Sequence, residues 1–89
     1  MFTKQLSRIE VECGLIRFGA DHKEMFPTND ETVIFVDNHG KEYVTHTHRT
    51  VNRIDGLTAM HKNNKAHEGT TITIHPIQGR DNTYKIIYQ

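Results

Sequence analysis

Apolar and polar residues alternate along much of the chain, which is the period-2 pattern of half-buried β-strands. One hairpin is predicted between residues 32–36 and 41–49. They are joined by the turn 37–40, whose asparagine and glycine tolerate the positive φ of a bulged hairpin loop. A second hairpin is predicted between residues 70–75 and 83–88, joined by a polar loop that contains glycine. The pattern therefore indicates a mainly β domain.

The segments outside these hairpins are short. The run 6–18 is expected to be extended, with Ile9 and Val11 on one face. Helices are predicted over residues 21–26 and 55–64, and the first has an aspartate three residues before a glutamate, the spacing of a capping box. Because both helices are too short to be stable alone, we expect them to close the openings of a β-barrel.

The aromatic residues allow two interpretations. Exposed rings could stack on the bases of a single-stranded nucleic acid. A small barrel without tryptophan, however, needs its phenylalanines inside to build a core. We therefore expect a core that contains Phe18, Phe26, Phe35, Val33, Ile54, Leu57, Ile72, Ile74 and Ile86.

The length of 89 residues indicates a single domain with one hydrophobic core. The chain has no apolar run of the ~18–20 residues that span a membrane, and its start lacks the apolar stretch of a secretory signal. The single cysteine excludes an internal disulfide, so a cytoplasmic location without membrane contact is expected. Because the sequence stops directly after a predicted strand, we expect residues 1–89 to be one recognition domain of a larger protein.

The charges are unevenly distributed although the net charge is zero, whereas nucleic-acid-binding domains are usually basic. Residues 21–42 hold six acidic residues and two lysines, a net charge of −4. Residues 44–67 hold four basic residues and one aspartate, a net charge of +3, together with four of the seven histidines. This polarity either reflects chance clustering in a short chain or lets one face attract phosphate.

Several short motifs follow one another in a distinctive order. In chain order they are Ile16-Arg17-Phe18, a short helix, Phe26-Pro27, a strand, the turn 37–40, a second strand, Arg53-Ile54-Asp55-Gly56-Leu57, a short helix with Asn63, and Gly69 before a strand. This succession over residues 6–77 resembles the DNA-binding pseudobarrel family. That family includes the plant B-three transcription-factor domain and the effector-type recognition domains of bacterial restriction endonucleases.

The resemblance implies a seven-stranded open pseudobarrel with two short helices. It also implies two arms that clasp double-stranded DNA in the major groove. The first arm corresponds to residues 12–15, with Arg17 beside it, and the second to residues 46–53. The implied partners are double-stranded DNA and the remainder of a parent restriction protein.

The second arm is rich in residue types that read base edges, because arginine pairs with guanine, asparagine with adenine, and threonine with either. We expect DNA base contacts from His46, His48, Arg49, Asn52 and Arg53. We expect contacts to the DNA backbone, or first-arm contacts, from Arg17, Lys62, Lys65, Cys13 and Gly14. The alternative is a solvated strand end whose charges bind nothing.

Other chemistries compete with DNA binding in this sequence. His46 and His48 share one face of a strand and could hold a metal ion, but a closed zinc site requires four ligands and no further motif supplies them. Cys13 could be a nucleophile, although a lone cysteine is more often structural. Asp37 and Glu42 could form a carboxylate pair, but Asp37 suits a turn. We therefore expect a domain without enzymatic activity, cofactor or metal.

The sequence thus favours sequence-specific recognition of double-stranded DNA by the target-recognition domain of a restriction-type protein. The alternative, favoured by the neutral charge, is a small β-barrel for protein interaction without nucleic acid. Recognition of RNA by the same surface is a further option. The positions of the basic side chains distinguish DNA binding from protein interaction. A single concave face would favour DNA if it carried Arg17, Arg49, Arg53, Lys62 and Lys65.

Overall fold

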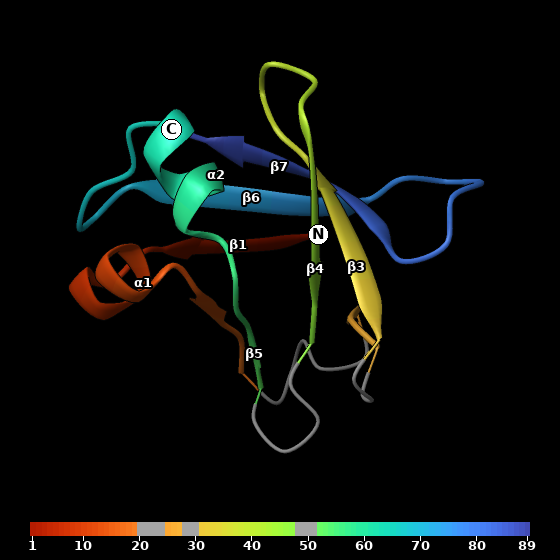
Figure 1. Ribbon diagram of the computed structural model, residues 1–89, viewed down its shortest axis with the longest axis horizontal. Helices are drawn as coiled ribbons and strands as arrows, with labels where there is room; N and C mark the ends of the chain where they lie inside the picture. Colours follow the sequence, from red (N-terminus) through yellow and green to blue (C-terminus); the bar gives the residue numbers. More distant parts are fainter. Residues whose placement is uncertain (20–24, 28–30, 48–51) are drawn as a thin grey trace.

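The computed structural model describes residues 1–19, 25–27, 31–47 and 52–89. In chain order its elements are β1 (Phe2–Gln5), α1 (Arg8–Cys13), β2 (Ile16–Arg17), β3 (Thr32–Val36), β4 (Glu42–His46), β5 (Arg53–Ile54), α2 (Thr58–Asn63), β6 (Thr71–Pro76) and β7 (Thr83–Tyr88). Five strands form a sheet in the order β1-β6-β7-β3-β4, and the other two form the ribbon β2-β5 (Figure 1). The described residues therefore form the expected mainly β fold of seven strands and two short helices.

Both hairpins predicted from the sequence are confirmed. β3 pairs antiparallel with β4, with Phe35 opposite Tyr43, and β6 pairs antiparallel with β7, with Ile74 opposite Ile86. Every second residue is buried along β3 and along most of β6, which is the burial that the alternating pattern indicates. β4 ends at His46, before the end of the predicted strand.

The two hairpins join because β3 pairs in parallel with β7, with Phe35 opposite Tyr84. β1 extends the sheet on the other side by pairing antiparallel with β6. Beyond β4, a bridge between Thr47 and Ile54 connects the sheet to the ribbon. In the described part of the chain, β1 and β2 are the two ends of this succession and are not paired with each other, so the barrel is open.

The first helix corrects the prediction that residues 6–18 are extended, because residues 8–13 are helical. Ser7 and Glu10 form a capping box, in which the Ser7 hydroxyl accepts from the Glu10 N–H (3.2 Å) and the Glu10 carboxylate accepts from the Ser7 N–H (2.9 Å). Consistent with a helix, Ile9 is 49% exposed while Val11 packs against the core.

The second helix, α2, confirms the prediction for residues 55–64 within the bounds 58–63. The helix predicted over residues 21–26 lies outside the described residues, apart from Met25 and Phe26. Neither α1 nor α2 has the length and hydropathy that crossing a membrane requires.

The core confirms the prediction made for it, because all nine residues expected there are buried. Phe26 lies at an aromatic centre, with ring centroids 4.8 Å from Phe18, 4.9 Å from Tyr84 and 6.2 Å from Phe2. These rings are therefore occupied by packing and are not exposed for stacking on bases. The core also contains residues that the prediction did not include: Phe2, Leu6, Ile16, Met60, Tyr84 and Tyr88.

Candidate nucleic-acid interface

The ribbon β2-β5 places two arginines directly opposite each other. Arg17 pairs with Arg53, and Ile16 pairs with Ile54. Since both isoleucines are fully buried and side chains alternate between the faces of a strand, the arginines share the outer face. Directly opposed residues have Cβ atoms ~4.5–5.5 Å apart, so two like charges lie side by side there.

The predicted second arm adjoins this pair. Asn52 is exposed, and its carbonyl oxygen accepts a hydrogen bond from the Phe18 N–H (3.0 Å), which continues the ribbon by one residue. His46, at the end of β4, is exposed and lies next to Thr47, which bridges to Ile54. The structure thus brings His46, Asn52, Arg53 and Arg17 to one end of the barrel. The predicted contacts His48 and Arg49 lie outside the described residues.

A buried carboxylate holds the backbone of Arg17, and sequence reasoning did not identify it. Glu10 is 1% exposed, and its Oε2 accepts hydrogen bonds from the Arg17 N–H (2.7 Å) and from Lys4 Nζ (2.7 Å). Lys4 Nζ also donates to the Arg17 carbonyl oxygen (3.0 Å). Because Lys4 belongs to β1 and Arg17 to β2, this cluster spans the opening of the barrel. We call Lys4, Glu10 and Arg17 the β1–β2 clamp.

The clamp also sets the charge state of Glu10. Burial alone would raise the pKa of its carboxyl group. The hydrogen bonds from Lys4, Arg17 and Ser7 outweigh burial and hold the pKa below its ordinary value. Glu10 is therefore ionised at neutral pH and balances the charge of Lys4, which is partly exposed.

Arg53 has an acidic neighbour of its own. Its Nε lies 3.2 Å from the Asp55 carboxylate, and both side chains are about one-third exposed. The ion pair fixes the direction in which the guanidinium leaves the strand and leaves its other N–H groups available for a further acceptor. This half-exposed pair contributes little to stability by itself.

The predicted first arm has a different structure from the loop that the resemblance implies. Cys13 is exposed at the last residue of α1. Gly14 is buried, and its carbonyl oxygen accepts a hydrogen bond from the Leu57 N–H (2.7 Å). Gly14 thus joins α1 to the start of α2, so a DNA contact at this residue would have to form at the edge of a helix junction. DNA contacts by Cys13 and Gly14 stay predictions.

The two predicted lysines lie elsewhere. Lys62 is exposed on α2 and Lys65 follows that helix, whereas Figure 1 shows β5 towards the opposite end of the barrel. The position of the basic side chains was expected to distinguish DNA binding from protein interaction. Those that the structure describes are divided between two ends of the barrel. Arg17 and Arg53 form one group, and backbone contacts by Lys62 and Lys65 stay predictions.

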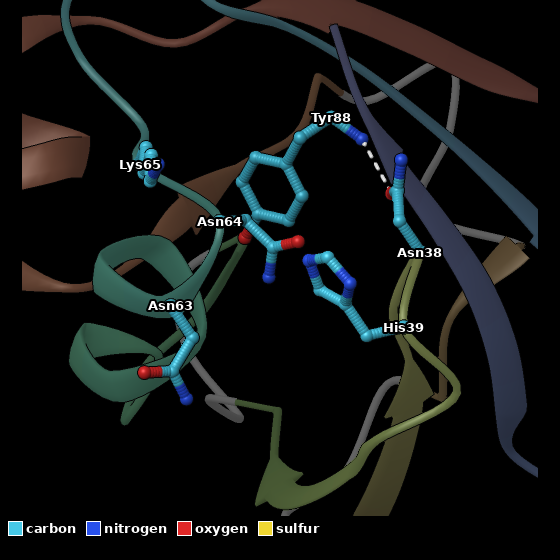
Figure 2. Close-up of a pocket in the computed structure, with 6 residues that line it drawn as sticks. All are labelled: Asn38, His39, Asn63, Asn64, Lys65 and Tyr88. Carbon is cyan, nitrogen blue, oxygen red and sulfur yellow. Dashed lines mark hydrogen bonds between the residues drawn. The ribbon is translucent and has the colours of Figure 1, made fainter.

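A polar pocket occupies the lysine-bearing end, with a volume of about 240 Å³. Its lining comes from the β3–β4 turn, the end of α2 and the end of β7, as Figure 2 shows. The lining residues are Asn38, His39, Asn63, Asn64, Lys65 and Tyr88.

Asp37 is hydrogen-bonded to Asn64, one of the residues that line this pocket. Its fully buried carboxylate accepts hydrogen bonds from two backbone N–H groups of its own turn, from the Tyr43 hydroxyl and from Asn64 Nδ2. Burial alone would raise the pKa of Asp37, but these four donors hold it below its ordinary value. The assignment of Asp37 to turn chemistry is thus confirmed, and the residue also ties the turn to α2.

A buried histidine, His61, contacts Tyr88, another residue that lines the pocket. The His61 ring is 2% exposed; its Nε2 lies 3.1 Å from the Leu15 carbonyl oxygen and its Nδ1 lies 2.7 Å from the Tyr88 hydroxyl. A carbonyl only accepts, so Nε2 carries the hydrogen and Nδ1 accepts from Tyr88. Burial lowers the pKa of His61, against smaller opposing effects of the Leu15 carbonyl and Glu10. His61 is therefore neutral at pH 7.

Metal binding by histidines or acids finds no support in the residues that the structure describes. Within them, no three histidine, cysteine or acidic side chains gather closely enough to hold an ion. His48, one half of the pair that suggested a metal, is not among these residues.

Comparison with known proteins gives similarity at the level of structure. No known family model and no curated protein sequence matches the chain. A hypothetical protein of Arabidopsis thaliana superposes with a TM-score of 0.75 at 22% identity, over 99% of this chain and 87% of that one. Arabidopsis FUS3, in a structure of its complex with DNA, superposes with a TM-score of 0.80 at 12% identity, over 99% of this chain and 94% of that one.

These two structures share the fold of this chain. The described strands and helices match a B-three-type pseudobarrel, so the fold expected from the order of motifs is confirmed. These two structures do not show a link to restriction effectors, and that part of the resemblance stays a prediction. At these identities the similarity concerns the fold and leaves function to be argued from the side chains.

Proposed function

We propose that the chain binds double-stranded DNA through the end of the barrel that carries the ribbon β2-β5. The observation that carries this proposal is the Arg17–Arg53 pair, held side by side on the outer face of the ribbon. Two opposed like charges destabilise a free ribbon, whereas a polyanion that lies between them removes the repulsion. Phosphate groups of DNA supply such charge at regular intervals.

The shared fold supports the same conclusion. FUS3 was solved in complex with DNA and has the same arrangement of strands over nearly the whole of this chain. The fold alone does not determine function, and it is the Arg17–Arg53 pair that makes the ribbon the first surface to test. We therefore extend the DNA-binding role of that neighbour to this chain as a proposal.

The finer proposal concerns sequence-specific recognition in the major groove. Asn52 and Arg53 have the side chains that form paired hydrogen bonds with adenine and guanine. Arg17, whose backbone the clamp fixes, is suited to a phosphate or to a base next to it. His46, His48 and Arg49 complete the proposed reading segment, the last two from outside the described residues.

We further propose that this recognition serves a restriction-type protein, of which residues 1–89 form the target-recognition domain. The support is the order of motifs that resembles effector-type recognition domains. On this proposal, cleavage or another activity belongs to the rest of the parent protein, and the domain itself only recognises the site.

The test is binding to a pool of randomised DNA duplexes, followed by sequencing of the bound fraction. The wild-type domain should bind at ~50 mM salt and weaken steeply as salt rises. Arg53→Ala should cost about 1–3 kcal/mol at the position that it reads. Arg17→Ala should reduce the slope of log affinity against log salt by about 1 if it contacts a phosphate.

Arg80→Ala is the matched control. Arg80 also pairs with an acid, since its Nη2 lies 3.1 Å from the Glu42 carboxylate. It sits in the β6–β7 connection, which Figure 1 shows well away from β5. DNA binding that is equally reduced by Arg80→Ala and Arg53→Ala would reflect loss of general charge and contradict the proposed surface. No retention of the pool at ~50 mM salt would refute DNA binding itself.

The second candidate function is protein interaction without nucleic acid. Two observations favour it: the basic residues are divided between two ends of the barrel, and Val44 is 70% exposed on the edge strand β4. An exposed edge with an apolar side chain is a common place for another chain to pair. If the duplex pool is not retained, a pull-down with the wild-type domain and with Val44→Lys becomes the next experiment, and a partner lost only in the variant would support this function.

A further inference from the structure

The pocket at the lysine-bearing end has fixed polar groups with unused hydrogen-bonding capacity. Asn38 Oδ1 accepts from the Tyr88 N–H (3.0 Å), which leaves its amide nitrogen as a donor at the rim of the pocket. Asn64 Nδ2 donates both to Asp37 Oδ2 (3.0 Å) and to the Met60 carbonyl oxygen (2.9 Å), which leaves Asn64 Oδ1 as an acceptor. Figure 2 shows this oxygen directed into the space beside the Tyr88 and His39 rings.

Two aromatic rings border the same space. The Tyr88 ring is fixed because its hydroxyl donates to the buried His61 ring (2.7 Å). The His39 imidazole is exposed on the turn across from it, as Figure 2 shows. Tyr88 belongs to the core and is 8% exposed, so the exposed His39 ring is the one available for stacking. A fixed donor and a fixed acceptor beside such a ring are features with which proteins hold unstacked nucleobases, by ring stacking and by edge hydrogen bonds.

Lys65 adds a cation, and it does so at a strained position. Its φ is +54°, in the left-handed region. The Ala66 N–H bonds to the His61 carbonyl (2.9 Å) and the Lys65 N–H to the Lys62 carbonyl (3.1 Å), the two hydrogen bonds of a Schellman motif. Glycine is the usual residue at this position. A lysine held there against its backbone preference indicates a use for its side chain.

From these groups we infer that the pocket binds a planar heterocycle that carries one anionic group, the chemistry of a nucleoside monophosphate. The ring packs beside Tyr88 and His39, its polar edge meets Asn64 Oδ1 and the Asn38 amide, and the phosphate binds Lys65. The volume of about 240 Å³ lies below the range of drug-sized sites, ~300–1,000 Å³, and so limits the ligand to about one nucleotide. The site is separate from the Arg17–Arg53 surface and does not depend on the proposed DNA binding.

The test is a titration of the full 89-residue chain followed by ¹H–¹⁵N NMR. The probes are adenosine, guanosine, cytidine and uridine 5′-monophosphates, the four nucleosides, and ribose 5-phosphate. At least one monophosphate should bind with a Kd of ~1 mM or tighter. It should shift the side-chain amide signals of Asn38 and Asn64 and the backbone signals of His39 and Lys65. Its parent nucleoside and ribose 5-phosphate should each bind more weakly.

Two variants separate the ligand from the fold. Lys65→Gly relieves the backbone strain, so it folds, and it should weaken the monophosphate about tenfold, the usual loss for one charge-assisted hydrogen bond, without weakening the nucleoside. Asn38→Asp keeps the acceptor for the Tyr88 N–H but replaces the donor by a negative charge, so it should abolish binding. Lys62→Ala, which removes an equal charge outside the lining, should leave affinity unchanged.

Each contrary outcome overturns the inference. Absence of shifts with every monophosphate shows that the pocket is not a nucleotide site. Equal affinity for ribose 5-phosphate and the monophosphates shows an anion site without ring recognition. Equal losses of affinity for the monophosphate in Lys65→Gly and Lys62→Ala show that the ligand is attracted by general charge alone.

Discussion

Gly14 is the position at which we expect a single methyl group to damage the fold most. It ends α1 with φ +67°, and a Cβ built there would lie 2.1 Å from Thr58 Oγ1, 2.6 Å from Thr58 N and 2.8 Å from Thr58 Cα. Rotation of the Thr58 side chain can move the first of these atoms but not the other two. The left-handed conformation costs an alanine roughly 1–2 kcal/mol, and overpacking against fixed backbone costs roughly 1–3 kcal/mol. Gly14→Ala should therefore lose about 2–5 kcal/mol.

The matched control is Gly79→Ala, where φ is +83° but no atom lies within 4 Å of the added Cβ. This variant carries only the backbone cost of roughly 1–2 kcal/mol. Urea unfolding followed by circular dichroism gives both free energies by linear extrapolation. The double variant Gly14→Ala/Thr58→Ala removes the Oγ1 clash and should recover only part of the loss. A loss in Gly14→Ala no larger than that in Gly79→Ala would refute the close approach of α1 and α2.

Three further predictions concern charge and backbone strain. Glu10→Gln leaves Lys4 without its carboxylate and should cost about 2–3 kcal/mol. Because the pKa of Glu10 is lowered, the wild-type protein should lose this stabilisation as pH falls from 4.5 through the pKa of the folded state. Melting temperatures measured over this pH range check the prediction. An equal fall in the melting temperature of Glu10→Gln would contradict it. Burial lowers the pKa of His61 below 6.5, so the unfolded chain takes up the proton first and stability should fall as pH drops below 6.5. NMR titration of that ring checks this, and a pKa above 6.5 refutes it. Lys65→Gly should raise the free energy of unfolding by about 1 kcal/mol, and with it the urea midpoint. A lower midpoint would show that the backbone of Lys65, at φ +54°, is not strained.

The hairpins and the core were predictable because their signals are local. The turn 37–40 and the alternation in β6 each lie within a few residues, and burial follows directly from that alternation. The assignment of residues 6–18 to a strand was wrong for a similar reason, since Ile9 and Val11 also alternate. The Ser7-x-x-Glu10 spacing of a capping box was present in the same segment and indicated the helix.

The contacts that shape the two sites could not be read from the sequence. Glu10 meets Arg17 because α1 reverses the chain between β1 and β2, and His61 meets Tyr88 across 27 positions of sequence. The side chains of such pairs carry no local pattern, and their pairing depends on the whole barrel. The Arg17–Arg53 register is of the same kind, because only the folded ribbon makes these residues opposite.

The order of strands in the main sheet has a consequence for synthesis of the protein. β6 and β7 are made after the other described strands, but they lie between β1 on one side and β3-β4 on the other. Among the described strands β1 pairs only with β6, so during translation it waits for residues 71–74 before it can form this pairing. The hairpin β3-β4 can form early, but it has to remain exposed until the parallel partner β7 leaves the ribosome. Such non-local pairing folds slowly, so the nascent domain exposes unpaired strand edges until β7 has been made.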